Sequence, residues 1–97
     1  MNELQYAEQA LCDIERVTDF LLAIDPIAAP DTADIILEAL NILTHSPEIG
    51  RKVAHGRREL VISRGRTGYL ALYQFFPQRQ RVLVLAVRHQ REAGYKQ

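Results

Sequence analysis

Arg81-Val82-Leu83-Val84-Leu85-Ala86-Val87-Arg88 is the stretch of this 97-residue chain that decides the fold. Its six central residues are apolar, so both alternating faces of an extended strand are apolar, as expected of a central strand covered on both sides. Two β-rich segments precede it, at residues 58–63 and 69–76, with turn residues at 65–68 and 77–80. The sequence therefore predicts a three-stranded antiparallel meander in its second half.

Two amphipathic stripes in the first half predict two helices. Apolar residues recur at spacings of three and four over residues 10–22, and again over residues 33–43. Asp31 or Thr32 is the expected N-cap of the second helix, because short polar side chains accept hydrogen bonds from the first backbone N–H groups. Only residues 26–30 connect the two helices, so we expect an antiparallel helical hairpin.

The order of these elements defines an α+β fold. Residues 2–6 predict a brief strand before the first helix, which gives the order β-α-α-β-β-β. We expect a single domain over residues 1–97, with the helical hairpin packed on one face of an antiparallel β-sheet. Tyr69, Tyr73 and Phe75 alternate along one strand face and are expected in the core beneath the helices.

The charges divide sharply between the two halves of the chain. Residues 1–48 hold ten acidic residues and one basic residue, a net charge of −9. Residues 49–97 hold eleven basic and two acidic residues, a net charge of +9. This asymmetry indicates either a polyanionic or acidic partner for the basic half, or two elements that neutralise each other within one fold.

Cysteine content and hydropathy favour a cytoplasmic protein. The lone Cys12 excludes an intramolecular disulfide, fits a reducing compartment and is expected to be a small packing residue of the first helix. The chain starts without the basic-then-apolar layout of a signal peptide, and no apolar run approaches the ~20 residues that span a bilayer. We therefore expect a cytoplasmic protein without a membrane partner.

The sequence contains no familiar metal-binding or phosphate-binding motif. It has no glycine-rich phosphate loop, no Cys-x-x-Cys and no His-Glu-x-x-His. His45, His55 and His89 are expected at a helix end, in a loop and at a strand end, so we do not expect them to converge as ligands. The prediction is therefore a protein without a metal site and without a cofactor.

The richest cluster of chemically active side chains is Arg88-His89-Gln90-Arg91-Glu92-Ala93-Gly94-Tyr95, at the end of the last predicted strand. Two guanidiniums, an imidazole and a phenol can clamp a phosphate and move protons, as a metal-independent ribonuclease requires. The alternative interpretation is a solvated strand terminus that forms ion pairs with the acidic helices. The residues alone leave both interpretations open.

Basic residues also gather around the first two strands of the meander. Arg64 and Arg66 flank the first turn, and Arg57 and Arg58 stand where a basic loop, residues 50–57, meets the first strand. Basic side chains beside exposed rings suit single-stranded nucleic acid. The alternative is that these arginines belong to a solvated loop and turn.

Several short motifs occur in a recognisable order. Ser46-Pro47-Glu48-Ile49-Gly50-Arg51, Arg58-Glu59-Leu60-Val61, Gly68-Tyr69-Leu70-Ala71-Leu72-Tyr73 and Arg88-His89-Gln90-Arg91-Glu92 follow the helical hairpin. Together with Ala10-Leu11-Cys12-Asp13-Ile14 in the first helix, they resemble the RelE/ParE superfamily of bacterial toxins over nearly the whole chain. The resemblance implies the toxin of a type II toxin–antitoxin (plasmid stabilisation) system, which a cognate antitoxin silences by direct binding.

The resemblance implies two competing activities. ParE-like members inhibit DNA gyrase and block replication, whereas RelE-like members are ribosome-dependent mRNA endonucleases. In the best-described RelE pattern, two lysines alternate on the strand before the Gly-Tyr turn, and an arginine follows that tyrosine. Val61, Ser63 and Leu70 occupy the corresponding places here, so most of that phosphate clamp is missing and the resemblance favours the ParE-like activity.

Site residues follow from the cluster and from the resemblance. Arg91 and Tyr95 match the last-strand arginine and tail tyrosine of the family. Under the ribonuclease alternative, the residues expected to act are Arg66, Arg88, His89, Arg91 and Tyr95. The expected binding surface consists of Arg57, Arg58, Arg64, Arg66, Arg88 and Arg91.

The expected partners are a cognate antitoxin and DNA gyrase, or the ribosome and mRNA under the alternative. An antitoxin tail of this kind is usually disordered alone and folds on binding, so it is expected to cross the helical hairpin and the outer sheet face. A homodimer and a toxin–antitoxin heterotetramer are both compatible with the sequence. A third alternative is a degenerate, non-toxic member that only binds an antitoxin.

Overall fold

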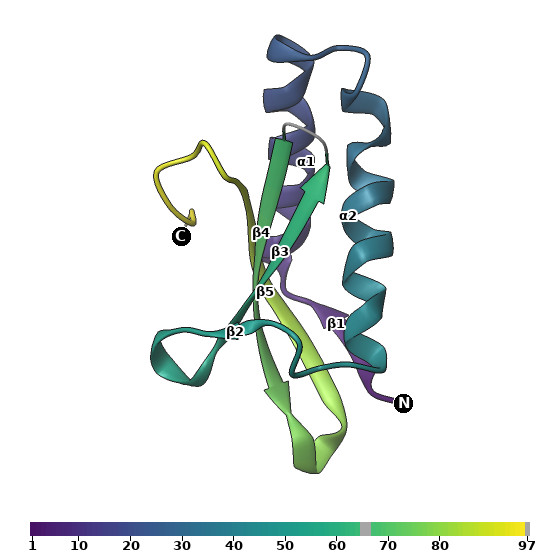
Figure 1. Ribbon diagram of the computed structural model, residues 1–97, viewed down its shortest axis with the longest axis vertical. Coiled ribbons are helices and arrows are strands. Elements are labelled where there is room, and N and C mark those ends of the chain that lie inside the picture. The colour runs from purple at the N-terminus through teal and green to yellow at the C-terminus, as the bar shows by residue number, and fades with distance from the viewer. Residues whose placement is uncertain (65–66, 97) are drawn as a thin grey trace.

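The apolar stretch at residues 81–88 forms β5, Arg81–His89, in the computed structural model, which describes residues 1–64 and 67–96. β5 lies between β1 (Glu3–Tyr6) and β4 (Thr67–Phe76) in a five-stranded sheet of order β1-β5-β4-β3-β2. β3 spans Arg58–Arg64 and β2 spans Arg51–Lys52. The brief N-terminal strand and the three strands of the meander are therefore confirmed (Figure 1).

The sheet is mixed rather than wholly antiparallel. β2 to β5 pair antiparallel, as the meander predicts, but β1 pairs with β5 in parallel, with Glu3 opposite Arg81 and Tyr6 opposite Val84. Parallel neighbours need a long crossover connection. Here the helical hairpin and three strands separate β1 from β5 along the chain, so this condition is met.

Both predicted helices are present. α1 spans Glu8–Ile24 and α2 spans Thr32–Leu40, and Figure 1 shows them side by side on one side of the sheet. A 3₁₀ turn, Asn41–Thr44 (η2), continues α2. Within residues 1–64 and 67–96, no helix has both the length and the apolarity to cross a membrane.

The expected cap of α2 is not formed. Asp31 precedes α2, but its side chain makes no capping hydrogen bond within the described part of the chain. The Thr32 hydroxyl instead donates to the Ala28 carbonyl at 3.4 Å. A 3₁₀ turn, Ala29–Asp31 (η1), already holds Asp31 near helical dihedral angles, whereas an N-cap side chain reaches its target from an extended backbone.

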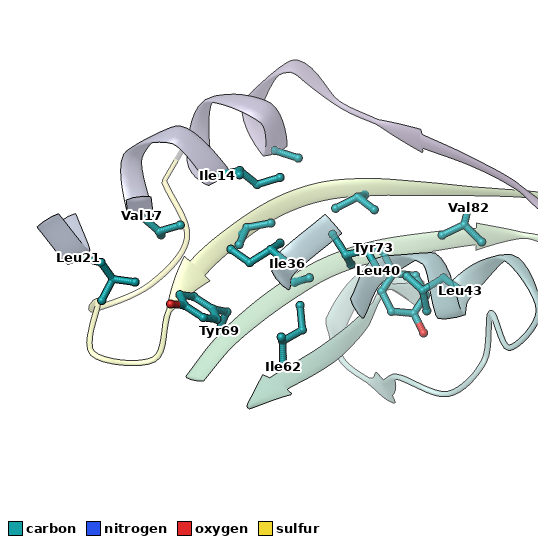
Figure 2. Packing of buried hydrophobic residues seen from close by; sticks show 14 of the residues in the cluster. Ile14, Val17, Leu21, Ile36, Leu40, Leu43, Ile62, Tyr69, Tyr73 and Val82 are labelled. Carbon is teal, nitrogen blue, oxygen red and sulfur yellow. The ribbon is translucent and has the colours of Figure 1, made fainter. Parts of the chain in front are cut away.

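The core lies between the helices and the sheet face that they cover, here called the inner face. Tyr69 and Tyr73 of β4 are fully buried in it, and Phe75 packs against it, as the alternation predicts. Apolar side chains of both helices and three strands meet there (Figure 2): Ile14, Val17, Leu21, Ile36, Leu40, Leu43, Ile62 and Val82.

A β-bulge in β5 changes which residues face the helices. Leu72 pairs with Ala86, whereas Tyr73 pairs with Val84, so β5 carries one extra residue at this point. Val84 and Val87 therefore both reach the inner face, although three positions separate them. The shift places Arg88 on the opposite, outer face, where it pairs with Leu70 of β4.

Coverage of β5 on both sides is not observed. None of the described helices lies on the outer face (Figure 1). Leu83 and Leu85 are only half-buried, whereas Val82 and Val84 on the inner face are fully buried. The apolar run at residues 82–87 therefore predicted more burial on the outer face of β5 than the structure shows.

Two further predictions are wrong in detail. The basic segment at residues 50–57 contains β2 and a 3₁₀ turn, Ala54–Gly56 (η3), and β2 is fixed by its pairing with Arg58 and Glu59. Cys12 is exposed instead of packed, because the helical period places it on the side of α1 opposite the buried stripe.

Candidate functional site

A network of charged and aromatic side chains joins β2, β3 and the C-terminal segment on the outer face. The Tyr95 hydroxyl donates a hydrogen bond to Glu59 Oε2 at 2.5 Å. Arg51 Nε donates to Glu59 Oε1 at 2.9 Å, and Arg51 Nη2 contacts the same oxygen. Both carboxylate oxygens of Glu59 are therefore engaged, although Glu59 is only 6% exposed.

Arg88 packs against the Tyr95 ring. Its guanidinium carbon is 5.2 Å from the ring centroid, a cation–π contact. Arg88 Nη1 also donates to the Glu92 carbonyl at 2.9 Å, which ties the segment after β5 to the strand. The C-terminal segment thus turns away from the helical hairpin and folds over the outer face (Figure 1).

The network shifts the protonation equilibria of its members. Burial raises the pKa of Glu59, but the hydrogen bonds from Tyr95 and Arg51 and the nearby charges outweigh it, so the pKa lies below its ordinary value. Burial and the Glu59 carboxylate raise the pKa of Tyr95 well above that of a free tyrosine. At neutral pH, Glu59 is an anion and Tyr95 is an uncharged hydrogen-bond donor.

His89, the neighbour of Arg88 in sequence, points to the inner face. It is fully buried, and its ring contacts Phe20 of α1 and Tyr69 of β4 at centroid distances of 5.4 and 5.5 Å. Burial and the charge of Arg91 lower the pKa of His89. His89 is therefore a neutral core residue, separated by the sheet from Arg88 and Tyr95.

The segment after β5 is also anchored to α1. Glu92 Oε1 accepts a hydrogen bond from the His89 backbone N–H at 2.8 Å, and Glu92 Oε2 pairs with Arg16. Arg16 also contacts Asp13 and donates to the Val87 carbonyl at 3.2 Å. The conformation of the C-terminal segment thus depends on contacts on both sides of the sheet.

Asp13 explains the Ala-x-x-Asp motif of the first helix. Its fully buried carboxylate accepts a hydrogen bond from the Val87 N–H at 2.9 Å. β1 ends at Tyr6, opposite Val84, so this edge of β5 has no strand neighbour at Val87 within the described residues. Side chains of α1 therefore satisfy the backbone groups of β5 that no strand pairs.

Tyr73 and Arg58 together fix the loop that contains the Ser-Pro-Glu-Ile-Gly motif. The Tyr73 hydroxyl donates to the Pro47 carbonyl and accepts from the Gly50 N–H, both at 2.8 Å. Arg58 donates to the carbonyls of Glu48 and Gly50 at 3.0 and 2.9 Å. A Cβ at Gly50 would approach Tyr73 to 2.5 Å, so only glycine fits there.

The structure separates the predicted site residues into different groups. Arg88 and Tyr95 meet on the outer face, His89 is buried in the core, and Arg58 holds the loop before β2. Arg57 is half-buried and Arg91 is exposed. The two remaining predicted residues are Arg64 and Arg66; Arg66 and the side chain of Arg64 lie outside the described residues.

Two important residues were missed from the sequence, and both carried a signal. Glu59 and Glu92 are the only acidic residues among residues 49–97. Each is engaged by an arginine and by a group of the C-terminal region, Glu59 by Arg51 and Tyr95, and Glu92 by Arg16 and the His89 N–H. The scarcity of acidic residues in the basic half was therefore the sequence signal that pointed to Glu59 and Glu92.

The outer face is apolar where the RelE pattern has cationic residues. Val61 of β3 lies opposite Leu70 of β4, and Val61 is 54% exposed. On its other side Leu70 pairs with Arg88 of β5, so the outer face carries a cation beside this apolar pair and not within it. Over residues 1–64 and 67–96, no group of three His, Cys, Asp or Glu side chains is placed to hold a metal ion.

The fold is shared with chains of several solved toxin–antitoxin structures. A chain of the chromosomal ParDE TA system from P. aeruginosa superposes with a TM-score of 0.77 at 19% identity, covering 92% of this chain and 96% of that chain. The intact E. coli RelBE toxin–antitoxin complex gives a TM-score of 0.65 at 17% identity, covering 95% of this chain and 100% of the matched chain. These two likenesses show that the chain shares the fold of proteins from ParDE and RelBE toxin–antitoxin systems.

Sequence comparison assigns the family. A family profile described as "ParE toxin of type II toxin-antitoxin system, parDE" matches residues 4–94. Toxin RelE3 of Caulobacter vibrioides is 29% identical over 92 residues, which cover 95% of this chain and 98% of that toxin. The chain belongs to the ParE toxin family.

Proposed function

We propose that this toxin inhibits DNA gyrase and thereby blocks replication, as ParE-like members do. The observation that carries the proposal is the apolar pair of Val61 and Leu70, which occupies the place of the RelE cations. Without cations at these positions, most of the RelE-like set that holds a scissile phosphate and stabilises its transition state is missing. Family membership and the ParDE structural neighbour support the same activity.

The deciding experiment is inducible expression without antitoxin, with DNA synthesis and protein synthesis followed separately. Gyrase inhibition predicts that DNA synthesis stops first, that cells filament and that mRNA stays intact. Purified toxin is then added to gyrase in a supercoiling assay, with Leu40→Ala, which weakens the core, as a folding control. Rapid translation arrest with cuts in mRNA, and normal supercoiling, would contradict the proposal.

Ribosome-dependent mRNA cleavage is the second candidate. The contact between Arg88 and Tyr95 favours it, since the two residues place a cation and a phenol together on the outer face. Under this activity, Arg88→Ala and Tyr95→Phe remove most cleavage, as mapped by primer extension on a reporter mRNA. His89→Phe keeps its cleavage at low temperature, because His89 is buried away from that face.

We also propose that an antitoxin tail docks along the helical hairpin and the outer face. A groove between α2 and β3 supports this docking, because it is lined by Ile42, Ile49 and Val61, which are 45%, 54% and 54% exposed. Beyond Glu59, β3 has no strand neighbour on this side within the described residues. An extended segment with alternating apolar residues fits such an edge.

The docking proposal is tested with the co-purified toxin–antitoxin complex. Ile42→Asp places a charge in the groove and is expected to weaken antitoxin binding at least about tenfold, because burying an unpaired charge is costly. Ile27→Asp is the matched control, since Ile27 is 90% exposed, lies in the connection between the two helices and does not line the groove. Equal affinities for both variants would contradict the docking site. A complex that forms without any toxicity in several hosts would instead support a degenerate, antitoxin-binding member.

A further inference from the structure

Three hydrogen-bond donors converge on the Glu59 carboxylate. Arg51 supplies Nε and Nη2 to Oε1, and Tyr95 supplies its hydroxyl to Oε2 at 2.5 Å. A fourth group, the Arg88 guanidinium, lies against the Tyr95 ring and adds its charge to the field at Glu59. This is the donor set that proteins use to hold a phosphate or a carboxylate from another molecule.

The charges around this carboxylate are not balanced. Arg51 and Arg88 carry two positive charges, whereas Glu59 carries one negative charge and Tyr95 is neutral. The pKa of Glu59 is lowered in spite of its burial, which shows how strongly the surrounding groups favour an anion at this position. A phosphate group presents more acceptor oxygens and up to two negative charges, so it would satisfy the same donors better than one carboxylate.

The position is reachable from solvent on one side. The Arg51 side chain is 64% exposed, whereas the Glu59 side chain beneath it is 7% exposed. β2 and β3 hold both backbones by the pairing of Arg51 with Glu59. An incoming anion therefore meets Arg51 first. Rotation of the Glu59 side chain exposes the Arg51 donors and the Tyr95 hydroxyl, and Arg88 contributes its charge.

We propose that Arg51, Arg88 and Tyr95 form a phosphate-binding site that the chain's own Glu59 occupies. An external phosphate group binds there only by displacing the Glu59 carboxylate. The site is thus closed by an internal competitor, and its affinity in the native protein is low. This inference rests on the geometry of the outer face and holds whether or not gyrase is the target.

The test compares two variants that each remove one negative charge. Glu59→Gln removes the internal competitor. Glu48→Gln is the control: the Glu48 side chain is 70% exposed, pairs with Arg58 and lies outside the network around Glu59. Binding of inorganic phosphate is followed through the NMR signals of the Arg51 Nε–H and the Tyr95 ring. We expect Glu59→Gln to raise the affinity for phosphate about tenfold or more over native protein, and Glu48→Gln to leave it within about twofold.

A second ligand distinguishes the source of the phosphate. A single-stranded DNA pentanucleotide without terminal phosphates carries only backbone phosphodiesters. An affinity gain for both ligands in Glu59→Gln assigns the site to a nucleic-acid backbone, and a gain for inorganic phosphate alone assigns it to free phosphate groups. Both outcomes support the site, and adding Arg51→Ala to Glu59→Gln must abolish either gain.

The inference is overturned if folded Glu59→Gln, checked by near-ultraviolet circular dichroism, binds phosphate no more tightly than native protein. If Glu59→Gln does not fold, Glu59→Asp replaces it, because it withdraws the carboxylate by one methylene and keeps the charge. Glu59→Asp is then expected to gain about threefold in phosphate affinity. An unchanged affinity for that variant overturns the inference equally.

Discussion

The two faces of the sheet are built on different physical principles. The inner face is filled by apolar side chains under two helices, with buried rings at Tyr69 and Tyr73. The outer face carries no helix within the described residues and is organised by ion pairs and hydrogen bonds around Glu59. Apolar burial therefore stabilises the inner face, whereas ion pairs and hydrogen bonds hold the outer face, where the proposed phosphate site lies.

Truncating one core side chain provides the strongest test of this contrast. Leu40 of α2 is fully buried on the inner side, so Leu40→Ala is expected to lower the free energy of unfolding by about 3 to 5 kcal/mol. Val61→Ala on the outer face should change it by less than about 0.5 kcal/mol, because Val61 is 54% exposed. Urea unfolding curves measure both, and similar losses would remove the distinction between the faces.

Asp13 tests a polar contact at the edge of the inner face. Asp13→Ala leaves the buried Val87 N–H without its acceptor and removes one of the three partners of Arg16, so we expect a loss of about 3 kcal/mol in the free energy of unfolding. Asp19→Ala is the control, since Asp19 is an exposed acid of the same helix. Urea unfolding measures both variants, and equal stabilities would show that the contact of Asp13 with Val87 does not stabilise the fold.

The two buried tyrosines of β4 form a matched pair. Tyr73→Phe removes a hydroxyl that bridges Pro47 and Gly50, so it should cost about 1 to 3 kcal/mol of unfolding free energy. The Tyr69 hydroxyl has no hydrogen-bond partner within the described residues, so Tyr69→Phe should cost almost nothing. Thermal unfolding of both variants checks this, and an equal loss would show that ring packing alone decides the stability.

A smaller effect on the inner face depends on pH. The pKa of His89 is lowered by burial, so the folded state binds fewer protons there than the unfolded state below the ordinary value of about 6.5. Its contribution to stability is therefore lost as the pH falls below about 6.5. His89→Phe should reduce this loss in unfolding measurements between pH 7 and 5, whereas His45→Phe, at an exposed position, should not.

The outer face is expected to respond at lower pH. The pKa of Glu59 is depressed, so its contribution is fully present above the ordinary glutamate value of about 4.3 and is lost as the pH falls through the lowered pKa. Glu59→Gln should flatten the stability profile in this acidic range and leave the range near pH 6 unchanged. An unchanged acidic profile would show that the network does not stabilise the fold.

The sequence predicted the elements well because alternation and helical periodicity report on burial. The limits of α1 and of β3 to β5 agree with the predicted segments to within a few residues. β2 escaped prediction because two residues carry no periodic pattern, and only the pairing of Arg51 with Glu59 makes them a strand.

The candidate site was harder to predict than the fold. Arg88 and His89 point to opposite faces because they are adjacent in a strand, and the bulge in β5 decides which face each of them takes. No residue of the strand predicts that bulge. The contact between Glu59 and Tyr95 joins residues 36 positions apart, so local patterns do not contain it. Arg58 was predicted to belong to a binding surface, but its guanidinium donates to backbone carbonyls of the loop before β2. The sequence does not distinguish these two roles.

The way in which α1 closes the edge of β5 has a consequence for assembly. An unpaired strand edge invites another chain to add a strand, and charged or covered edges prevent this. Asp13 and Arg16 occupy the backbone groups of Val87, so an added strand finds no partners there. Beyond Glu59, by contrast, β3 has no strand neighbour on that side within the described residues, so the strand addition proposed for an antitoxin tail is expected at β3 and not at the Val87 edge of β5.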